Sequence, residues 1–449
     1  MKIVSESPTN RPRCSYPCRL NTESFNVCDR PDLEYDLVIM SARKWFRRVT
    51  ITLLSLVVIA YIGTCVWLKI NEHRLVFTRD LPTEPLSESL GFQPQTVQIG
   101  TLGSVPVFAW SIQSLPNNSA ANQWVLHFHG SGDNVTSWFN QRELHRLRDM
   151  GFGILAPEYP GYAGKPGEPT EQAVEQEAQI AYDYLRKTGN VPERNIVIYG
   201  TSLGTGVAVD LASHVRAGAL VLIGPYTSVV DVGKLRYPYL PISLLASDRF
   251  ESDKKIGAVH MPVFIFHTVE DKVIPFEEGR RLYELAGAHK HFEEAHGPHG
   301  SATYPSFLAL HAFLNTSAGF NVHPPRKPIS AVLAETVEAK GVQAAIAQYQ
   351  ELRALHGDEY DFEQHDLNLL GYTLLSKGKT ADAIAILKLN AEQYPSTFYV
   401  YDGLGDAYLS VGDKQAALDN FRRSLQNYPG ADNPSRKKLD ALLASTKNQ

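Results

Sequence analysis

The chain has 449 residues, about three times the usual length of one domain, so two or three folded units are expected. Apolar residues make up 43% and charged residues 20%, an ordinary globular composition that excludes a mainly disordered or collagen-like chain. The 48 acidic and 43 basic residues leave a net charge of −5. This argues against nucleic acid as the main partner, because binding to phosphates needs a basic excess or a basic face.

All four cysteines lie in the first 65 residues, at Cys14, Cys18, Cys28 and Cys65. The rest of the chain therefore has no disulfide, no thiolate metal ligand and no cysteine nucleophile. The first three could be considered as zinc ligands, but no fourth ligand follows at a regular spacing. No metal and no cofactor is expected.

The first 48 residues are expected to form a polar segment on the cytoplasmic side of a membrane. Residues 1–39 contain proline and show no periodicity. Met40 is followed by a basic run, so we hypothesise that the natural chain begins there and that residues 1–39 are an untranslated or disordered extension. N-terminal sequencing that finds residue 1 or 2 would reject this hypothesis.

An uncharged stretch follows from Val49 to Leu68. About 20 helical residues extend over about 30 Å, enough to cross a bilayer core, so residues 49–70 are predicted to be a transmembrane helix. Basic residues precede it at positions 43, 44, 47 and 48. The positive-inside rule then keeps the N-terminus cytoplasmic and places everything after residue 70 in a periplasm or a lumen. A cleaved signal peptide and a buried core helix are the alternatives.

Residues 75–316 alternate between short apolar runs and stretches of helical periodicity. The predicted strands are Trp124–Phe128, Gly153–Glu158, Ile196–Tyr199, Ala219–Ile223, Val263–His267 and His291–Glu294. The predicted helices are Trp138–Met150, Thr170–Lys187, Leu203–His214, Glu277–Ala286 and Tyr304–Leu314. This alternation predicts a mostly parallel sheet with helices on both faces, and Thr96–Ile99 and Val105–Ser111 are expected to add an antiparallel pair at its edge.

A proline-bearing linker at residues 317–329 ends the alternation, and residues 330–443 are helical with positions that recur 34 residues apart. The pattern resembles tetratricopeptide repeats. The recurring pairs are Gly371 and Gly405, Ala383 and Ala417, Leu387 and Phe421, Tyr394 and Tyr428, and Pro395 and Pro429. A degenerate earlier unit is expected around Gly341, Ala345, Ile346 and Tyr349. Such repeats form a concave surface, so a protein or peptide partner is expected there.

The segment Gly200-Thr201-Ser202-Leu203-Gly204 follows an apolar strand and opens a helical stretch. It has the G-x-S-x-G pattern of a tight turn that lifts a serine hydroxyl clear of a sheet, at a helix N-terminus where negative charge is favoured. Only very small side chains are tolerated at the flanking positions of such a turn. We therefore predict Ser202 as a nucleophile, with a glycine-rich turn and a helix-capping serine as the alternative.

A serine hydroxyl needs a base to remove its proton, and the base needs a carboxylate to orient it. Asp271 lies just past the strand Val263–His267 and is the predicted acid, whereas its neighbour Glu270 is the weaker candidate. Two histidines follow the next strand. His299 is favoured as the base over His296, because it lies deeper in the loop and directly before the last helix.

Attack on an ester carbonyl produces an oxyanion, which needs two backbone N–H donors. Leu203, directly after the nucleophile, is predicted to supply one of them. Ser131 in the loop 129–134 is predicted to supply the other, because the small residues there let the backbone approach a substrate. His129 is expected to fix this loop by hydrogen bonding.

As a set, these segments resemble an α/β-hydrolase of the membrane-anchored serine hydrolase group that includes monoacylglycerol and lysophospholipid lipases and protein depalmitoylases. The resemblance covers a little over half of the chain. It rests on HGSGDN (129–134), PEYPGYAGKPG (157–167), GTSLG (200–204), GPYTS (224–228), DRF (248–250), EDKVIP (270–275) and the histidine loop. It implies an α/β-hydrolase fold and the site roles given above. Two departures are His267-Thr268, where the group usually has His-Gly, and Ser131 in place of a common asparagine.

The apolar and aromatic stretch 237–245 suits an acyl chain near a bilayer, although the packing of a short helix explains it as well. We expect a membrane-anchored serine hydrolase of carboxylic esters or thioesters, with acyl or lipid substrates and a tetratricopeptide-like tail. One alternative is a membrane-tethered scaffold that carries a relic hydrolase domain. Another is an acyltransferase, in which an alcohol other than water accepts the acyl group.

Overall fold

The computed structural model describes residues 31–78, 81–87, 90–115, 122–287, 289–431 and 433–447. Residues 1–30, with Cys14, Cys18 and Cys28, lie outside this part, so the predictions for that segment stay untested. The chain divides between Thr64 and Cys65 into two compact units, and everything from the sheet onward belongs to the second.

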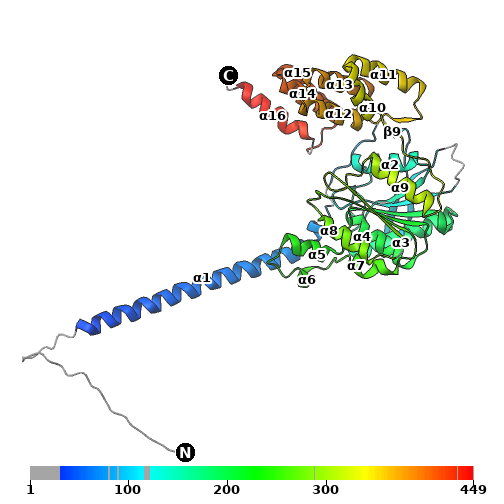
Figure 1. Ribbon diagram of the computed structural model, residues 1–449. Coiled ribbons are helices and arrows are strands. Elements are labelled where there is room, and N and C mark those ends of the chain that lie inside the picture. Colours follow the sequence, from blue (N-terminus) through cyan, green and yellow to red (C-terminus); the bar gives the residue numbers. More distant parts are fainter. Residues whose placement is uncertain are drawn as a thin grey trace, which may run out of the picture. The chain divides into compact units, whose positions relative to one another are not determined.

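The first helix, α1 (Pro31–Val76), is longer than the predicted 49–70 at both ends (Figure 1). The helix thus includes residues 31–48 of the segment that the sequence predicts to be polar and cytoplasmic, and it begins within residues 1–39, where the sequence shows no periodicity. Proline suits a first helical turn, where its missing N–H needs no partner, and Gly63 is the sole glycine that follows within the helix.

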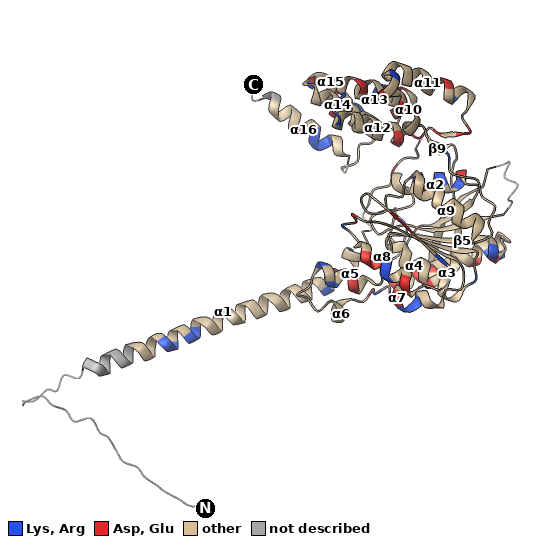
Figure 2. Ribbon diagram, in the orientation of Figure 1, with Lys and Arg blue, Asp and Glu red and all other residues tan. Residues whose placement is uncertain are grey.

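Residues Ile39–Val76 of α1 are long and apolar enough to cross a membrane by length and composition. Lys and Arg residues precede a long uncharged stretch on this helix (Figure 2). None of the most apolar window is buried, and Leu54 and Val57, for example, are exposed. This exposure contradicts the alternative of a buried core helix.

An eight-stranded sheet is the centre of the second unit, with the spatial order β1-β2-β4-β3-β5-β6-β7-β8. Its strands are β1 (Gln95–Leu102), β2 (Val105–Ile112), β3 (Trp124–Phe128), β4 (Gly153–Pro157), β5 (Ile196–Thr201), β6 (Ala219–Ile223), β7 (Val263–Thr268) and β8 (Lys290–Ala295). The pairs β1–β2 and β2–β4 are antiparallel, and all others are parallel. The predicted parallel sheet with an antiparallel edge is confirmed.

Helices cover both faces of this sheet, as the alternation predicts (Figure 1). One face packs against α3 (Glu171–Asp183), α4 (Leu203–His214) and α8 (Phe276–Leu285). The other packs against α2 (Trp138–Asp149) and α9 (Tyr304–Thr316). The predicted helix 170–187 is divided, because α3 ends at Asp183 and a π-helical turn continues over Tyr184–Thr188. The short helices α5 (Val229–Arg236), α6 (Ile242–Leu245) and α7 (Ser252–Lys255) lie between β6 and β7.

The C-terminal region is helical throughout, apart from a two-residue strand pair. Its helices are α10 (Ile329–Lys340), α11 (Val342–Leu355), α12 (Gln364–Ser376), α13 (Thr380–Gln393), α14 (Phe398–Ser410), α15 (Lys414–Asn427) and α16 (Pro434–Lys447). Part of the predicted linker is ordered by pairing, because β9 (Lys327–Pro328) pairs in parallel with β10 (Tyr360–Asp361).

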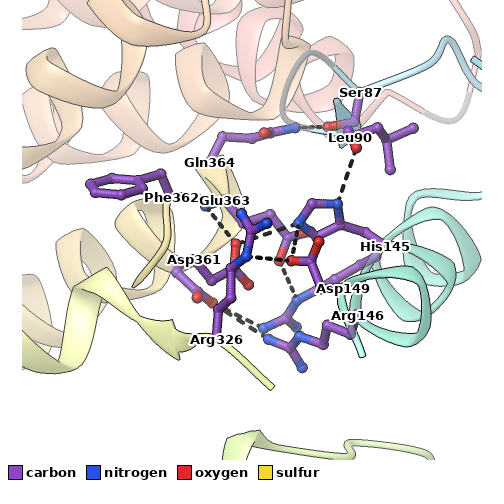
Figure 3. A network of polar contacts seen from close by, with 12 residues as sticks. Ser87, Leu90, His145, Arg146, Asp149, Arg326, Asp361, Phe362, Glu363 and Gln364 are labelled. Carbon is purple, nitrogen blue, oxygen red and sulfur yellow. Dashed lines mark hydrogen bonds and ion pairs between the residues drawn. The ribbon is translucent and has the colours of Figure 1, made fainter. Parts of the chain in front are cut away.

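A buried set of charged groups joins α2 to the helical region, and we call it the charged contact. Arg142 donates from Nε to Glu363 at 2.9 Å and from Nη2 to Asp366 at 3.0 Å. Figure 3 shows His145 of the same helix between the Leu90 carbonyl, 3.1 Å from its Nδ1, and the carboxylates of Asp149 and Asp361, 3.4 and 3.7 Å from its Nε2.

Candidate active site

The turn between β5 and α4 holds Ser202 in a conformation that side chains rarely adopt. Its φ is 54° and its ψ is −119°. A Cβ on Gly200 would lie 2.3 Å from the Gly204 carbonyl oxygen, and a Cβ on Gly204 would lie 2.2 Å from the Phe128 carbonyl oxygen. The expectation that only very small residues fit beside Ser202 is therefore confirmed, and the strained turn presents the hydroxyl at the carboxyl end of β5.

Two side chains from the ends of neighbouring strands extend the contact from this hydroxyl: the first bonds to the hydroxyl, and the second bonds to the first. His299, in the loop after β8, places Nε2 2.8 Å from the Ser202 Oγ. Its Nδ1 lies 2.6 Å from Oδ2 of Asp271, which follows β7. The other Asp271 oxygen accepts the N–H groups of Val273 and Ile274, at 2.8 and 2.9 Å. The structure thus brings together the three residues that the sequence predicts.

Asp271 is an ionised carboxylate in a protein interior. Burial alone would raise its pKa, but hydrogen bonds from His267 and His299 and from the backbone of Ile274 hold the pKa well below its usual value. The His267 Nε2 lies 3.0 Å from the Ile274 carbonyl and 3.3 Å from Oδ2 of Asp271. His267 is a supporting residue that sequence reasoning noted only as a departure from the usual pattern.

The second histidine of the loop has a different environment. The side chain of His296 is 84% exposed, and its Nδ1 lies 2.6 Å from Glu270. Within the part of the chain that the structure describes, His296 makes no hydrogen bond to Ser202. Both of the weaker candidates, Glu270 and His296, therefore pair with each other at the surface.

The loop after β3 approaches Ser202 closely. A Cβ added to Gly130 would lie 3.2 Å from the Ser202 Cβ. No hydrogen bond of the described residues uses the N–H of Ser131 or of Leu203, the two predicted oxyanion donors. Both residues line the same cavity as Ser202, so both N–H groups remain available to a ligand.

The segment after β4 holds this loop in place. The Tyr159 hydroxyl donates to the His129 carbonyl at 3.0 Å, and the Tyr162 hydroxyl donates to the Ser131 carbonyl at 3.1 Å. His129 itself is buried, with Nδ1 2.8 Å from the Gly130 carbonyl and Nε2 3.1 Å from Glu158. These contacts agree with the fixing role expected of His129. The two tyrosines are functional contacts that no spacing in the sequence could reveal.

Comparisons with known proteins agree with the fold. Residues 125–289 match the family model of the alpha/beta hydrolase family. The chain contains a domain with the α/β-hydrolase fold, called the hydrolase domain below. An uncharacterized protein of Mycobacterium tuberculosis is 36% identical over 146 residues, which are 32% of this chain and 52% of the relative. The lysophosphatidylserine lipase ABHD12 of Danio rerio is 26% identical over 224 residues, 44% of this chain and 58% of the relative.

These matches span a little over half the length of the curated relatives. Among solved structures, an esterase of Pyrococcus furiosus is similar to the hydrolase domain. It aligns with 53% of this chain and 98% of its own length, at 18% identity and a TM-score of 0.44.

A cavity of about 480 Å³ opens at Ser202 of the hydrolase domain, within the size range of small-molecule sites. Ser131, Ser202 and Leu203 lie at its reactive end. The rest of its lining is mostly apolar and comes from the end of α1, from α5 and α6, and from the loop after β7: Leu68, Glu72, Leu75, Val76, Tyr226, Val229, Val232, Gly233, Arg236, Tyr237, Ile242, Leu245, Ala246, Val273 and Ile274.

A buried carboxylate on α2 contacts β5, the strand that leads to Ser202. Glu143 accepts hydrogen bonds from the Tyr199 hydroxyl at 2.6 Å and from the Thr201 hydroxyl at 3.1 Å, and it lies 2.8 Å from the His127 Nε2. Thr201 directly precedes Ser202, so Glu143 ties α2 to the turn. Nothing local in the sequence indicates this role.

One acidic cluster among the described residues has the spacing of a metal site. Oxygen atoms of Asp361, Glu363 and Asp366 lie within 4.8 Å of one another. Arg142 and His145 already contact these carboxylates as ion-pair partners, and the cluster belongs to the charged contact rather than to the cavity at Ser202.

Proposed function

We propose that this chain is a membrane-anchored serine hydrolase that cleaves carboxylic esters or thioesters through an acyl-enzyme. The observation that carries the proposal is the chain of hydrogen bonds from Ser202 through His299 to Asp271, at 2.8 and 2.6 Å. Such a chain makes a serine oxygen nucleophilic, because the imidazole accepts its proton while the carboxylate stabilises the resulting imidazolium.

In the first half-reaction, Ser202 Oγ attacks the acyl carbon and its proton passes to Nε2 of His299. The carbonyl oxygen becomes an oxyanion that accepts the N–H groups of Ser131 and Leu203. His299 then returns the proton to the leaving alcohol or thiol. In the second half-reaction, water attacks the acyl-enzyme with His299 as its base, and the carboxylic acid leaves.

Acyl or lipid substrates fit the apolar lining of the cavity. One relative is a lysophosphatidylserine lipase by name, which favours a lipid ester over a small polar one. In this proposal residues 49–70 of α1 cross the membrane, with the N-terminus cytoplasmic and the hydrolase domain in a periplasm or a lumen. Labelling of single introduced cysteines from either side of the membrane tests this orientation.

The helical region is proposed to be a tetratricopeptide-like array that binds a protein or peptide. A Cβ on Gly371 would meet Leu387 at 2.5 Å, and a Cβ on Gly405 would meet Phe421 at 2.4 Å, so equivalent positions 34 residues apart make equivalent close contacts. A glycine with positive φ separates the helices of each of three pairs, at Gly341, Gly378 and Gly412. The recurring glycine with positive φ between paired helices was not identified from the sequence.

Replacement of the nucleophile tests the proposed reaction. Ser202→Ala should lose about 10⁴-fold or more of the turnover of a short-chain ester and should no longer react with a fluorophosphonate probe. Ser213→Ala is the matched control, because Ser213 lies near the other end of α4, where its hydroxyl donates to the Asp210 carbonyl at 2.7 Å.

Persisting ester hydrolysis in Ser202→Ala would reject the assignment. Failure of the wild-type protein to react with the probe would favour the scaffold with a relic domain. Formation of a glycerol ester in the presence of added glycerol would favour acyl transfer over hydrolysis.

A further inference from the structure

The end of α1 does more than connect an anchor to the hydrolase domain. Leu68, Leu75 and Val76 line the cavity that opens at Ser202, together with Glu72. Leu68 is buried in a small apolar cluster with Val230 of α5 and Ile242 of α6. One wall of the cavity thus comes from residues that precede the sheet in the chain.

Polar contacts hold this part of α1 against the loop that follows α6. Glu72 is buried and accepts the N–H groups of Ser247 and Asp248, the latter at 3.0 Å. Lys69 donates to the Leu245 carbonyl at 2.8 Å. His73 places Nδ1 2.7 Å from Asp248. These bonds fix the end of the helix whose residues Leu68, Glu72, Leu75 and Val76 line the cavity.

The part of the cavity lining that comes from α5 and α6 is mostly apolar, with Arg236 as its charged residue. It includes Val229, Val232 and Tyr237 of the α5 segment and Leu245 and Ala246 at the end of α6. On the outer side of the same segment, Leu235, Tyr239 and Leu244 are 60, 88 and 84% exposed. An exposed apolar surface beside an apolar cavity suits a substrate that is delivered from a lipid surface rather than from water.

We propose that the last turns of α1, residues 65–76, form one wall of an acyl-chain site, so that the membrane anchor is itself part of the substrate-binding site. A long acyl chain, whose carbonyl carbon lies at Ser202, extends along the cavity and contacts Leu68, Leu75 and Val76 of α1 as well as the lining residues of α5 and α6. This inference rests on the proposed function and adds the substrate class, an ester of a long-chain fatty acid.

A cavity-filling variant tests the inference in the full chain in detergent micelles. Leu75 lines the cavity but is 49% exposed, so Leu75→Trp can occupy cavity space without a buried clash. Ile70→Trp is the matched control, because Ile70 is on the same helix, is 75% exposed and does not line the cavity. The substrates are p-nitrophenyl acetate and p-nitrophenyl palmitate.

We expect Leu75→Trp to lower the ratio of kcat/KM for the palmitate ester to kcat/KM for the acetate ester about tenfold or more. Ile70→Trp should change neither value by more than about twofold. Equal palmitate-to-acetate ratios in Leu75→Trp and the wild-type protein would overturn the inference, as would an equal loss in Ile70→Trp.

The two proposals fail in different ways. If the wild-type protein hydrolyses neither ester and its Ser202 does not react with a fluorophosphonate probe, the proposed function is wrong. If acetate hydrolysis and probe labelling are normal but Leu75→Trp keeps the wild-type chain-length preference, only the inference about α1 is wrong. Labelling of Leu75→Trp by the small probe also shows that the hydrolase domain of the variant is folded.

Discussion

The end of α1 and the C-terminal helical region both contact the hydrolase domain, but they bring different chemistry to it. Around the end of α1, a few polar bonds at Lys69, Glu72 and His73 border a cavity of about 480 Å³ with an apolar lining. The contact leaves space beside Ser202 instead of filling it.

The charged contact between α2 and the helical region has the opposite character (Figure 3). The side chains of Glu363 and Asp366 are 6 and 3% exposed, and Arg142 binds both. Arg326 of the linker lies 3.4 Å from Asp149, and Gln364 bonds to Ser87. Charges and amides fill this contact and pair across segments that are far apart in the sequence, while Oε1 of Gln364 and Oδ2 of Asp366 are buried without a hydrogen-bond partner among the described residues.

The difference teaches what each contact is suited to do. An apolar cavity wall can stay exposed at little cost in free energy. Covering it with an apolar ligand is favourable, because apolar surface is then removed from water. Buried charges are costly unless each keeps its partner, so the charged contact accepts one geometry and penalises every other. We therefore expect the cavity to accept ligands and the helical region to keep a fixed position on α2.

The largest expected effect is at Arg142. Arg142→Ala leaves Glu363 and Asp366 buried without their main partner, and we expect the free energy of unfolding to fall by about 3–5 kcal/mol. Chemical denaturation of the detergent-solubilised chain measures this loss.

Arg422→Ala is the control, because the ion pair of Arg422 with Asp419 is exposed and should be worth less than about 1 kcal/mol. Arg142→Lys keeps the charge but loses the two-pronged geometry, so an intermediate loss is expected. Equal small losses in Arg142→Ala and Arg422→Ala would show that the charged contact does not hold the two regions together.

The pH dependence of stability is the next effect in size. Burial by itself lowers the pKa of His145, but the hydrogen bond to Asp361 and the charges of Asp149, Asp361 and Glu363 outweigh it and raise the pKa to about 9. A raised pKa means that the folded state favours the protonated ring. The stabilisation is therefore fully present below pH 6.5, the usual value, and is lost as the pH rises through about 9.

The loss should reach about 3 kcal/mol across that window, measured by denaturation at a series of pH values. Glu363 acts in the same direction at lower pH, because burial and the neighbouring Asp361 and Asp366 raise its pKa from 4.5 to about 7 despite Arg142. In His145→Gln, the free energy of unfolding should depend less on pH above pH 6.5 than it does in the wild-type protein. An unchanged slope in that variant would assign the pH dependence to other groups.

Glu143 tests whether the charged contact influences the nucleophile strand, since it follows Arg142 on α2 and faces the sheet. Glu143→Gln weakens the bonds from Tyr199 and Thr201, and we expect a loss of about 2 kcal/mol in the free energy of unfolding. We also expect a lower kcat for acetate hydrolysis with little change in KM, because the turn that carries Ser202 is less well held. A change in KM alone would argue against this positioning role.

The smallest effect is expected at the edge of the cavity. Glu72→Gln weakens charge-assisted bonds to the Ser247 and Asp248 N–H groups, at a cost of about 1 kcal/mol. Hydrogen exchange of these two amides should accelerate about fivefold, whereas global unfolding changes little. Glu251→Gln is the control, because Glu251 pairs with Arg249 and Lys254 instead. Equal exchange in both variants would mean that Glu72 does not hold the loop.

Much of the fold could be predicted because its signals are local. The strand Ala219–Ile223 and the helix Leu203–His214 match the prediction residue for residue, since a buried parallel strand is continuously apolar and a helix repeats every few residues. The helix α1 extends beyond the predicted membrane-spanning segment 49–70 at both ends, because hydropathy marks the uncharged core of a helix and not its polar ends.

The sequence by itself determined the order of the elements, the tight turn at Ser202 and the choice of Asp271, because each depends on neighbours along the chain. Only the tertiary structure decided that His299 and not His296 reaches Ser202, and that Tyr159 and Tyr162 hold the loop of Ser131. The same is true of the wall that α1 supplies to the cavity and of the charged contact. Pairs such as Arg142 and Glu363 lie more than two hundred residues apart, and no local periodicity or spacing records which distant surfaces meet when a chain folds.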